Sequence, residues 1–251
     1  MLTSIVPSRS IAIATTAIAI AFLAGCAETT SPTPPATAGH EHAHEHVEPQ
    51  VPWAEQLAAV RAGTSDRIET SDDVTPEQFA ELATGCDGLT TLRVAFPEVN
   101  AERLSVLPQL VGLQHLLISG PVDDDALTVI ARCPTLEILN LPDGTFTDAG
   151  FEQLKSLPLL TLLRIGSPQV TDAGIAVLPE LPNLRQLHII NIPITDDGLD
   201  SIRQVKLLQS FYLDGGECTD EGLGCLLKAR EDLHMHVDQL HIGGDKHAHS
   251  H

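Results

Sequence analysis

Two neighbouring 24-residue stretches decide the fold: residues 160–183, LTLLRIGSPQVTDAGIAVLPELPN, and residues 184–207, LRQLHIINIPITDDGLDSIRQVKL. Both open with a Leu-x-x-Leu-x-Ile pattern, continue with an apolar residue followed by Thr-Asp-x-Gly, and then show apolar residues at helical spacing. Self-similarity at a fixed period indicates a repeat architecture, in which each unit buries its apolar face only against its neighbours.

The same unit extends in both directions along the chain. Its leading leucine recurs every 23 or 24 residues, at Leu89, Leu113, Leu136, Leu160, Leu184 and Leu208. Near the middle of each unit lies a residue whose side-chain oxygen can cap a helix: Asn100, Asp123, Thr147, Thr171, Thr195 and Thr219. We therefore predict an α/β solenoid in which each coil contributes one strand and one helix.

An aspartate follows the cap in every unit from the second onward. These residues are Asp124, Asp148, Asp172, Asp196 and Asp220. A carboxylate at the first helical position stabilises the positive end of the helix dipole. That role explains the five aspartates, so we do not predict that they bind Ca²⁺.

The repeated units resemble the leucine-rich repeat family over roughly residues 65 to 240. Thr171-Asp172-Ala173-Gly174-Ile175 and Thr195-Asp196-Asp197-Gly198-Leu199 are similar to the ribonuclease-inhibitor-like and F-box-type class. The resemblance implies a horseshoe with a parallel sheet on the concave side, helices outside, and a role in binding other macromolecules. The units are shorter than the F-box type and lack its strand-adjacent cysteine, which leaves subclass and curvature open.

Both ends of the repeat array carry sequences that can cover a terminal coil. Residues 53–62 form an amphipathic pattern ended by Gly63, which predicts a capping helix. Thr75-Pro76-Glu77-Gln78-Phe79 has the cap and proline of a first outer helix. Met235 and Val237 occupy the inward positions of a last strand, so we assign residues 53–240 to the repeat domain.

The N-terminal segment has the features of an export signal. After Arg9, residues 11–23 are uncharged and apolar, and as a helix they would rise about 20 Å, too short to span a bilayer. Leu23-Ala24-Gly25-Cys26 resembles the bacterial lipobox. The resemblance implies that residues 1–25 are a signal peptide and that Cys26 is acylated, as with palmitate, and anchored to a bacterial membrane on the extracytoplasmic, periplasmic side. An ordinary secretory signal is the alternative, and inner versus outer membrane stays open.

Two histidine-rich tracts flank the repeat domain. Residues 26–52 contain five prolines and little to bury, which indicates a disordered tether, and residues 241–251 indicate a similar tail. The tract histidines are His40, His42, His44, His46, His247, His249 and His251. Imidazole binds Zn²⁺, Cu²⁺ or Ni²⁺, so one interpretation is metal buffering and the other is a compositionally biased spacer. We predict no other cofactor.

The remaining cysteines are Cys86, Cys133, Cys218 and Cys225. Cys86 and Cys133 occupy one column two coils apart, which separates them by about 10 Å and exceeds the reach of a disulfide. We expect all four to be reduced and to pack as small apolar side chains.

One strand column predicts a binding surface. The residue between the two inward positions of each strand faces the concave side: Arg93, Leu117, Asn140, Arg164, His188, Tyr212 and His236. No acidic residue stands in this set, and with the neighbours His115 and His234 it forms a partly basic strip suited to an acidic or carboxylate-bearing partner. The other interpretation is that exposed strand positions simply carry solvated side chains.

Composition excludes several functions. The chain has 14 Lys and Arg against 34 Asp and Glu, a formal net charge of −20, which disfavours nucleic acid and anionic lipid. It lacks a Gly-x-Ser-x-Gly and a phosphate-binding glycine loop, and the repeat pattern uses most potential catalytic residues as helix caps or core, so we do not predict an enzyme. We predict a monomeric, membrane-anchored module or scaffold that recognises a protein or other macromolecule, or else a metal-buffering lipoprotein that acts through its tracts.

Overall fold

The computed structural model describes residues 51–238 and 240–241, which belong to one compact unit, residues 48–251. The predicted signal peptide, Cys26, the tether up to residue 50 and all seven tract histidines lie outside the described residues. No helix within the described part has the length and hydropathy needed to cross a bilayer.

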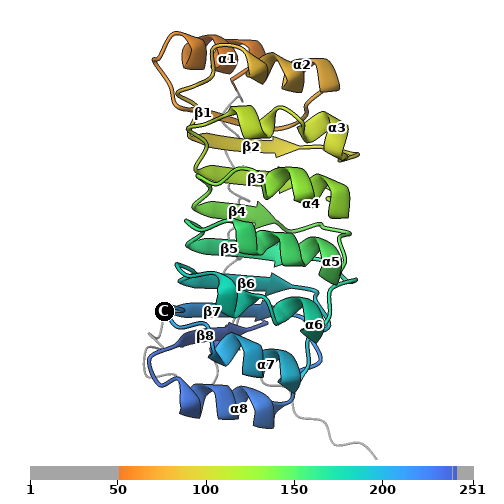
Figure 1. Cartoon of the computed structure of the whole chain (residues 1–251), viewed down its shortest axis with the longest axis vertical. Coiled ribbons are helices and arrows are strands. Elements are labelled where there is room, and N and C mark those ends of the chain that lie inside the picture. The colour runs from red at the N-terminus through yellow and green to blue at the C-terminus, as the bar shows by residue number, and fades with distance from the viewer. Residues whose placement is uncertain (1–50, 239, 242–251) are drawn as a thin grey trace, which may run out of the picture. The chain divides into compact units, whose positions relative to one another are not determined.

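The described strands form one sheet in strict sequence order (Figure 1). They are β1 (Arg67–Asp73), β2 (Thr91–Ala95), β3 (His115–Ser119), β4 (Ile138–Leu141), β5 (Leu162–Gly166), β6 (Gln186–Ile190), β7 (Ser210–Asp214), β8 (His234–Val237) and β9 (Leu240–His241). Strands β1 to β8 are parallel, and β9 returns antiparallel to β8. The predicted alternation of strand and helix is confirmed, whereas the closing strand β9 was not predicted.

Helices α2 to α8 line the side of the coils opposite the open face of the sheet, whereas α1 lies beside β1 at the end of the stack (Figure 1). They are α1 (Trp53–Arg61), α2 (Pro76–Ala80), α3 (Ala101–Leu104), α4 (Asp124–Ile130), α5 (Asp148–Phe151), α6 (Asp172–Ile175), α7 (Asp196–Arg203) and α8 (Asp220–Ala229). Short 3₁₀ helices follow some of them: η1 (Glu81–Ala83), η2 (Leu107–Gln109), η3 (Glu152–Ser156) and η4 (Leu178–Glu180). All six predicted cap residues accept a hydrogen bond from a first-turn amide.

Several outer helices are shorter than the sequence pattern suggested. Helices α3 and α6 have only four residues each before the chain tightens into a 3₁₀ turn. Pro108 and Pro179 lie four residues after Leu104 and Ile175, so the amides that an α-helix would need at these points are missing. Helices α4, α7 and α8 have no proline at that position and continue for 7, 8 and 10 residues. Helix α5 also ends after four residues although Lys155 stands there, so proline accounts for the shortening of α3 and α6 alone.

The core is one continuous apolar column along the stack. Leu92, Leu116, Leu139, Leu163 and Leu187 are register partners on adjacent strands, and none is more than 1% exposed. Because each coil buries these side chains against the next coil, the stacking that the 24-residue period predicted is the main source of stability.

The aspartate column links successive coils. Oδ1 of Asp124 accepts the backbone N–H of Thr147 at 2.6 Å, and its Oδ2 accepts the Thr147 hydroxyl at 2.8 Å. The same pair of bonds recurs for Asp148 with Thr171, Asp172 with Thr195 and Asp196 with Thr219. These four aspartates therefore do more than begin their own helices, because each one also fixes the cap residue of the next coil.

The glycine of the Thr-Asp-x-Gly motif makes room for this contact. A side chain at Gly150, Gly174, Gly198 or Gly222 would overlap the carboxylate of the preceding coil's aspartate. The equivalent position in the earlier coil is Ala126, and there the preceding coil has Ala101 in place of an aspartate. The motif thus follows from a close approach between coils.

The cysteine prediction holds for two residues and fails for a third. Cys86 and Cys133 are 2% exposed, and all four cysteines in the described part are free. Cys225 is exposed, which contradicts its predicted burial. In the coils of α4 and α6 the equivalent positions are the buried Val129 and Val177, whereas Cys225 borders a hollow between α7 and α8 that leaves it accessible.

Candidate functional site: the open face of the sheet

The seven predicted site residues all lie on the open face of the sheet, and we call this set the strand-face strip. It comprises Arg93, His115, Arg164, His188, Tyr212, His234 and His236. Strand alternation puts them there: in β7, Phe211 and Leu213 are buried whereas Tyr212 between them is half-buried.

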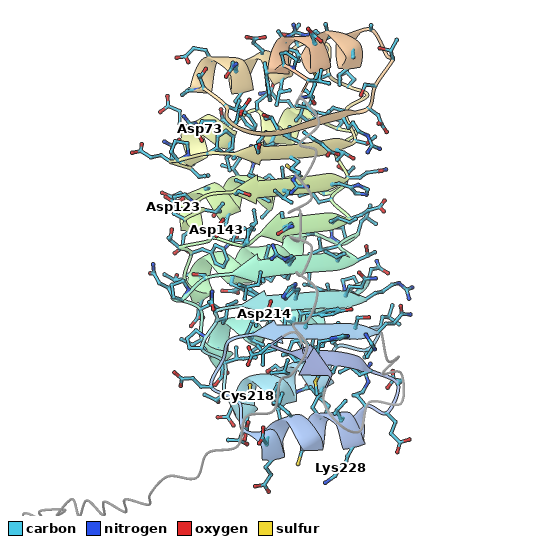
Figure 2. All side chains as sticks on the ribbon, turned by 180° about the vertical axis from the view of Figure 1, so that it is seen from behind. Asp73, Asp123, Asp143, Asp214, Cys218 and Lys228 are labelled. Carbon is cyan, nitrogen blue, oxygen red and sulfur yellow. The ribbon has the colours of Figure 1, made fainter. Side chains whose placement is uncertain are left out.

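A hydrogen-bonded chain organises the middle of the strip. Nη1 of Arg164 donates to Oδ1 of Asn140 at 3.1 Å, and Nε donates to Nδ1 of His188 at 3.3 Å. Nε2 of His188 lies 2.7 Å from Oδ2 of Asp214, which Figure 2 labels on this face. Since Nδ1 accepts from the guanidinium, the His188 proton resides on Nε2 and is donated to the carboxylate. The arrangement holds the Arg164 guanidinium in one orientation.

Tyr212 connects this chain to the end of the strip. Its ring stacks on His236 with centroids 4.8 Å apart and an interplanar angle of 18°, and it lies 5.6 Å from the His188 ring. His234 and His236 approach each other with their Nε2 atoms 2.7 Å apart. Arg164, His188, Tyr212, His234 and His236 therefore form one contiguous cluster.

Arg93 and His115 lie further along the sheet, at a hollow that they share with Arg164. The hollow has a volume of about 360 Å³, and its apolar lining includes Leu117, Ile138 and Leu162. A smaller hollow of about 130 Å³ adjoins it, because Leu162 and Arg164 line both. His188 and Tyr212 border the smaller one. Two cationic side chains thus flank an apolar surface, a combination that suits an apolar group carrying a carboxylate.

The predicted column holds no acidic residue, but two carboxylates lie beside it on the same face. Glu69 of β1 pairs in register with Arg93 and lines the larger hollow, and its carboxylate lies 3.7 Å from Arg67. The prediction left out the first strand because its apolar pattern is degenerate. Asp214 lies two residues after Tyr212, so continuing the strand alternation by one step would have found it. The open face as a whole is therefore less basic than the strip alone, and His188 has an acidic partner in Asp214.

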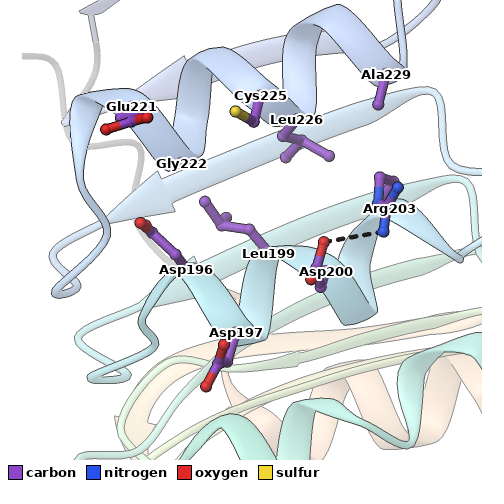
Figure 3. Close-up of a pocket in the computed structure, with 10 residues that line it drawn as sticks. All are labelled: Asp196, Asp197, Leu199, Asp200, Arg203, Glu221, Gly222, Cys225, Leu226 and Ala229. Atoms are coloured by element: carbon purple, nitrogen blue, oxygen red, sulfur yellow. Dashed lines mark ion pairs between the residues drawn. The ribbon is translucent and has the colours of Figure 1, made fainter.

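A second hollow lies on the helix side, between α7 and α8 (Figure 3). It has a volume of about 370 Å³ and is bordered by Asp196, Asp197, Asp200 and Glu221, while the exposed Cys225 stands at its edge. Arg203 pairs with Asp200 at 3.0 Å, and Asp196 is engaged by Thr219. Across the described residues, no three His, Cys, Asp or Glu side chains are grouped to hold a metal ion.

Comparison with known proteins supports the fold. No protein-family model and no curated protein matches the chain. Among solved structures it is similar to an internalin (inlF) from Listeria monocytogenes, with 20% identity and a TM-score of 0.51. The match covers 68% of this chain and 46% of that one, so the chain spans about half the length of that internalin. It is also similar to internalin C2 from the same species, with 17% identity and a TM-score of 0.51, over 78% of this chain and 88% of that one.

These likenesses and the sheet topology define the class of the fold. The described part of the chain is an α/β solenoid. More particularly, it has the leucine-rich repeat fold, in which parallel strands line one side and short helices the other.

Proposed function

We propose that this protein is a lipid-anchored, non-enzymatic binding module of the bacterial cell envelope. In this proposal the strand-face strip recognises a protein partner through an apolar segment that bears a carboxylate. Cys26 carries the acyl chains on the extracytoplasmic side, and residues 26–52 separate the anchor from the repeat domain. The Thr-Asp-x-Gly motifs support placing the repeats in the ribonuclease-inhibitor-like subclass.

The observation that carries the proposal is the larger hollow, where Arg93 and Arg164 flank Leu117, Ile138 and Leu162. Guanidinium groups bind carboxylates in a bidentate geometry, and Arg and Tyr side chains contribute strongly at protein interfaces. Asn140 and His188 hold Arg164 before any partner arrives, so little side-chain entropy is lost on binding. The net charge of −20 disfavours nucleic acid as the partner.

Affinity capture from envelope extract tests this proposal with the mature chain as bait. Arg164→Glu and Tyr212→Ala should each lose the specifically captured protein, by about tenfold or more in affinity once it is purified. Arg203→Glu on α7 is the matched control, because it reverses an exposed arginine on the helix side. Capture that survives both strip variants, or that the control also loses, contradicts a role for the strip.

The anchor is tested separately. Cells supplied with labelled palmitate should incorporate the label into the wild-type chain and not into Cys26→Ala. Incorporation into neither chain would support an ordinary secretory signal.

Metal buffering by the two tracts is the alternative function, and the alternating histidines of residues 40–46 and 247–251 favour it. The full chain should then bind more Zn²⁺ than a chain whose tract histidines are replaced by serine. Equal stoichiometry would remove this alternative.

A further inference from the structure

The last coil places two histidines side by side on the open face of the sheet. His234 and His236 lie two residues apart on β8, and the fully buried Met235 between them points into the core. Alternation along the strand therefore sends both imidazoles to the same side. Their Nε2 atoms are 2.7 Å apart, with the ring centroids 4.6 Å apart.

We propose that His234 and His236 together bind a divalent transition-metal ion such as Ni²⁺, Cu²⁺ or Zn²⁺. This site belongs to the folded domain, is separate from the two tracts, and does not depend on carboxylate recognition at the larger hollow. Water molecules take the remaining coordination positions in this proposal.

The nitrogen geometry fits this role. At 2.7 Å the N–H of one Nε2 points at the lone pair of the other, so both nitrogens already face a common centre. Metal–imidazole bonds of about 2.0–2.1 Å place two neighbouring ligand nitrogens roughly 3 Å apart. Small ring rotations reach that separation, and the donor ring takes the tautomer with its proton on Nδ1, so both neutral rings present an Nε2 lone pair to the ion with no net loss of a proton.

The surroundings limit the motion of both rings. Tyr212 stacks on His236 with an interplanar angle of 18°, and its ring lies 6.2 Å from that of His234. Backbone pairing with β7 on one side and β9 on the other fixes β8. A pair held in this way loses little entropy on binding an ion, and the chain's charge of −20 raises the local cation concentration.

The sequence supplies a local probe of this site. Tyr212 is the single tyrosine of the chain and stacks directly on His236. Trp53, the single tryptophan, lies on α1 beside the first strand, at the other end of the sheet from β8 (Figure 1). A paramagnetic ion at the histidine pair should quench Tyr212 emission and leave Trp53 emission unchanged. Ni²⁺ suits this purpose because thiols such as the exposed Cys225 do not reduce it.

The test uses the mature chain with all tract histidines substituted. These changes are His40→Ser, His42→Ser, His44→Ser, His46→Ser, His247→Ser, His249→Ser and His251→Ser. Titration with Ni²⁺ should quench Tyr212 to a plateau at one ion per chain. His234→Ala in this background, which keeps the Tyr212–His236 stack, should abolish the saturable quenching, and so should the double variant with His236→Ala.

His115→Ala is the matched control, because His115 lies on the same face at β3, away from the pair, and contacts Thr91. It should leave the quenching intact. Quenching that persists without His234 and His236 would overturn the proposal. Quenching seen only in the chain with its natural tracts would also overturn the proposal and would assign the ion to the histidine tracts. Far-ultraviolet circular dichroism and thermal unfolding verify that each variant is folded.

Discussion

At the scale of single residues, the position in the stack decides the chemistry of each cysteine. Burial raises the pKa of the Cys133 thiol to about 12. Burial, with smaller contributions from Asp196 and Asp172, does the same for the pKa of Cys218. Both thiols therefore stay protonated and unreactive at neutral pH. Cys225 is exposed at the hollow between α7 and α8.

Brief treatment of the native chain with N-ethylmaleimide should consequently modify Cys225 well before Cys86, Cys133 or Cys218. Peptide mapping by mass spectrometry measures the order, and full labelling after denaturation verifies that all four thiols were free. Cys225→Ser should remove the fast phase. Comparable rates at Cys133 and Cys225 would contradict the burial described here.

At the scale of elements, the aspartate at the start of one helix and the glycine at the start of the next should be energetically coupled. The Asp196 carboxylate accepts both the amide and the hydroxyl of Thr219, and a side chain at Gly222 would displace it. Gly222→Ala alone should destabilise the protein by about 1 kcal/mol. In the Asp196→Ala background the same substitution should cost nothing or stabilise, because alanine favours the helix and the space is vacant.

Urea unfolding of the four chains of this cycle measures the coupling. Ala101 and Ala126 show that the paired alanine combination is compatible with the fold. Additive effects of the two substitutions would mean that the aspartate and the glycine do not constrain each other.

The same contact predicts an acid sensitivity. The Thr219 amide, and then its hydroxyl, hold the pKa of Asp196 below its ordinary value of 3.8. The folded pKa lies under the unfolded one, so the contribution to stability is present above pH 3.8 and is lost as pH falls through the folded value. Wild type should therefore exceed Asp196→Asn in unfolding free energy at pH 7, and the gap should narrow below about pH 4. A gap that is constant from pH 7 to pH 3 contradicts this linkage.

The sequence predicted the elements better than their ends and contacts. Register, inward leucines and cap residues follow from a local period, so residues such as Leu163 and Thr171 were placed correctly. To predict that α3 and α6 end early, one would have to check which positions lack a backbone N–H, as Pro108 and Pro179 do. The link from each aspartate to the next coil, and the placement of Asp214 beside His188, depend on contacts across coils, which a pattern within one coil does not contain.

At the scale of the whole repeat domain, the outer edges of the parallel strands β1 and β8 both have partners. The side chain of Gln56 on α1 imitates a neighbouring strand: its Oε1 accepts the N–H of Glu69 at 2.8 Å and its Nε2 donates to the Glu69 carbonyl at 2.9 Å. The Ser65 hydroxyl likewise accepts the N–H of Arg67 and donates to the Arg67 carbonyl, both at 3.2 Å. At the other edge β9 pairs with β8. A long sheet with an open edge can pair with another copy, so these contacts favour a monomer.

Gln56→Ala should therefore expose the β1 edge and promote self-association. The substitution removes two hydrogen bonds to the strand backbone, each worth about 1 kcal/mol, and leaves a donor and an acceptor available to a second chain. Sedimentation velocity over a range of concentrations should show a concentration-dependent larger species for the mature, unacylated chain carrying Gln56→Ala. Gln153→Ala is the matched control, because that glutamine bonds to the Ala149 carbonyl on the helix side, away from either edge. If Gln56→Ala sediments as wild type at every concentration, the bulk of α1, and not this side chain, protects the edge. Association by the control as well would mean that the sheet edge is not the surface through which the chains meet.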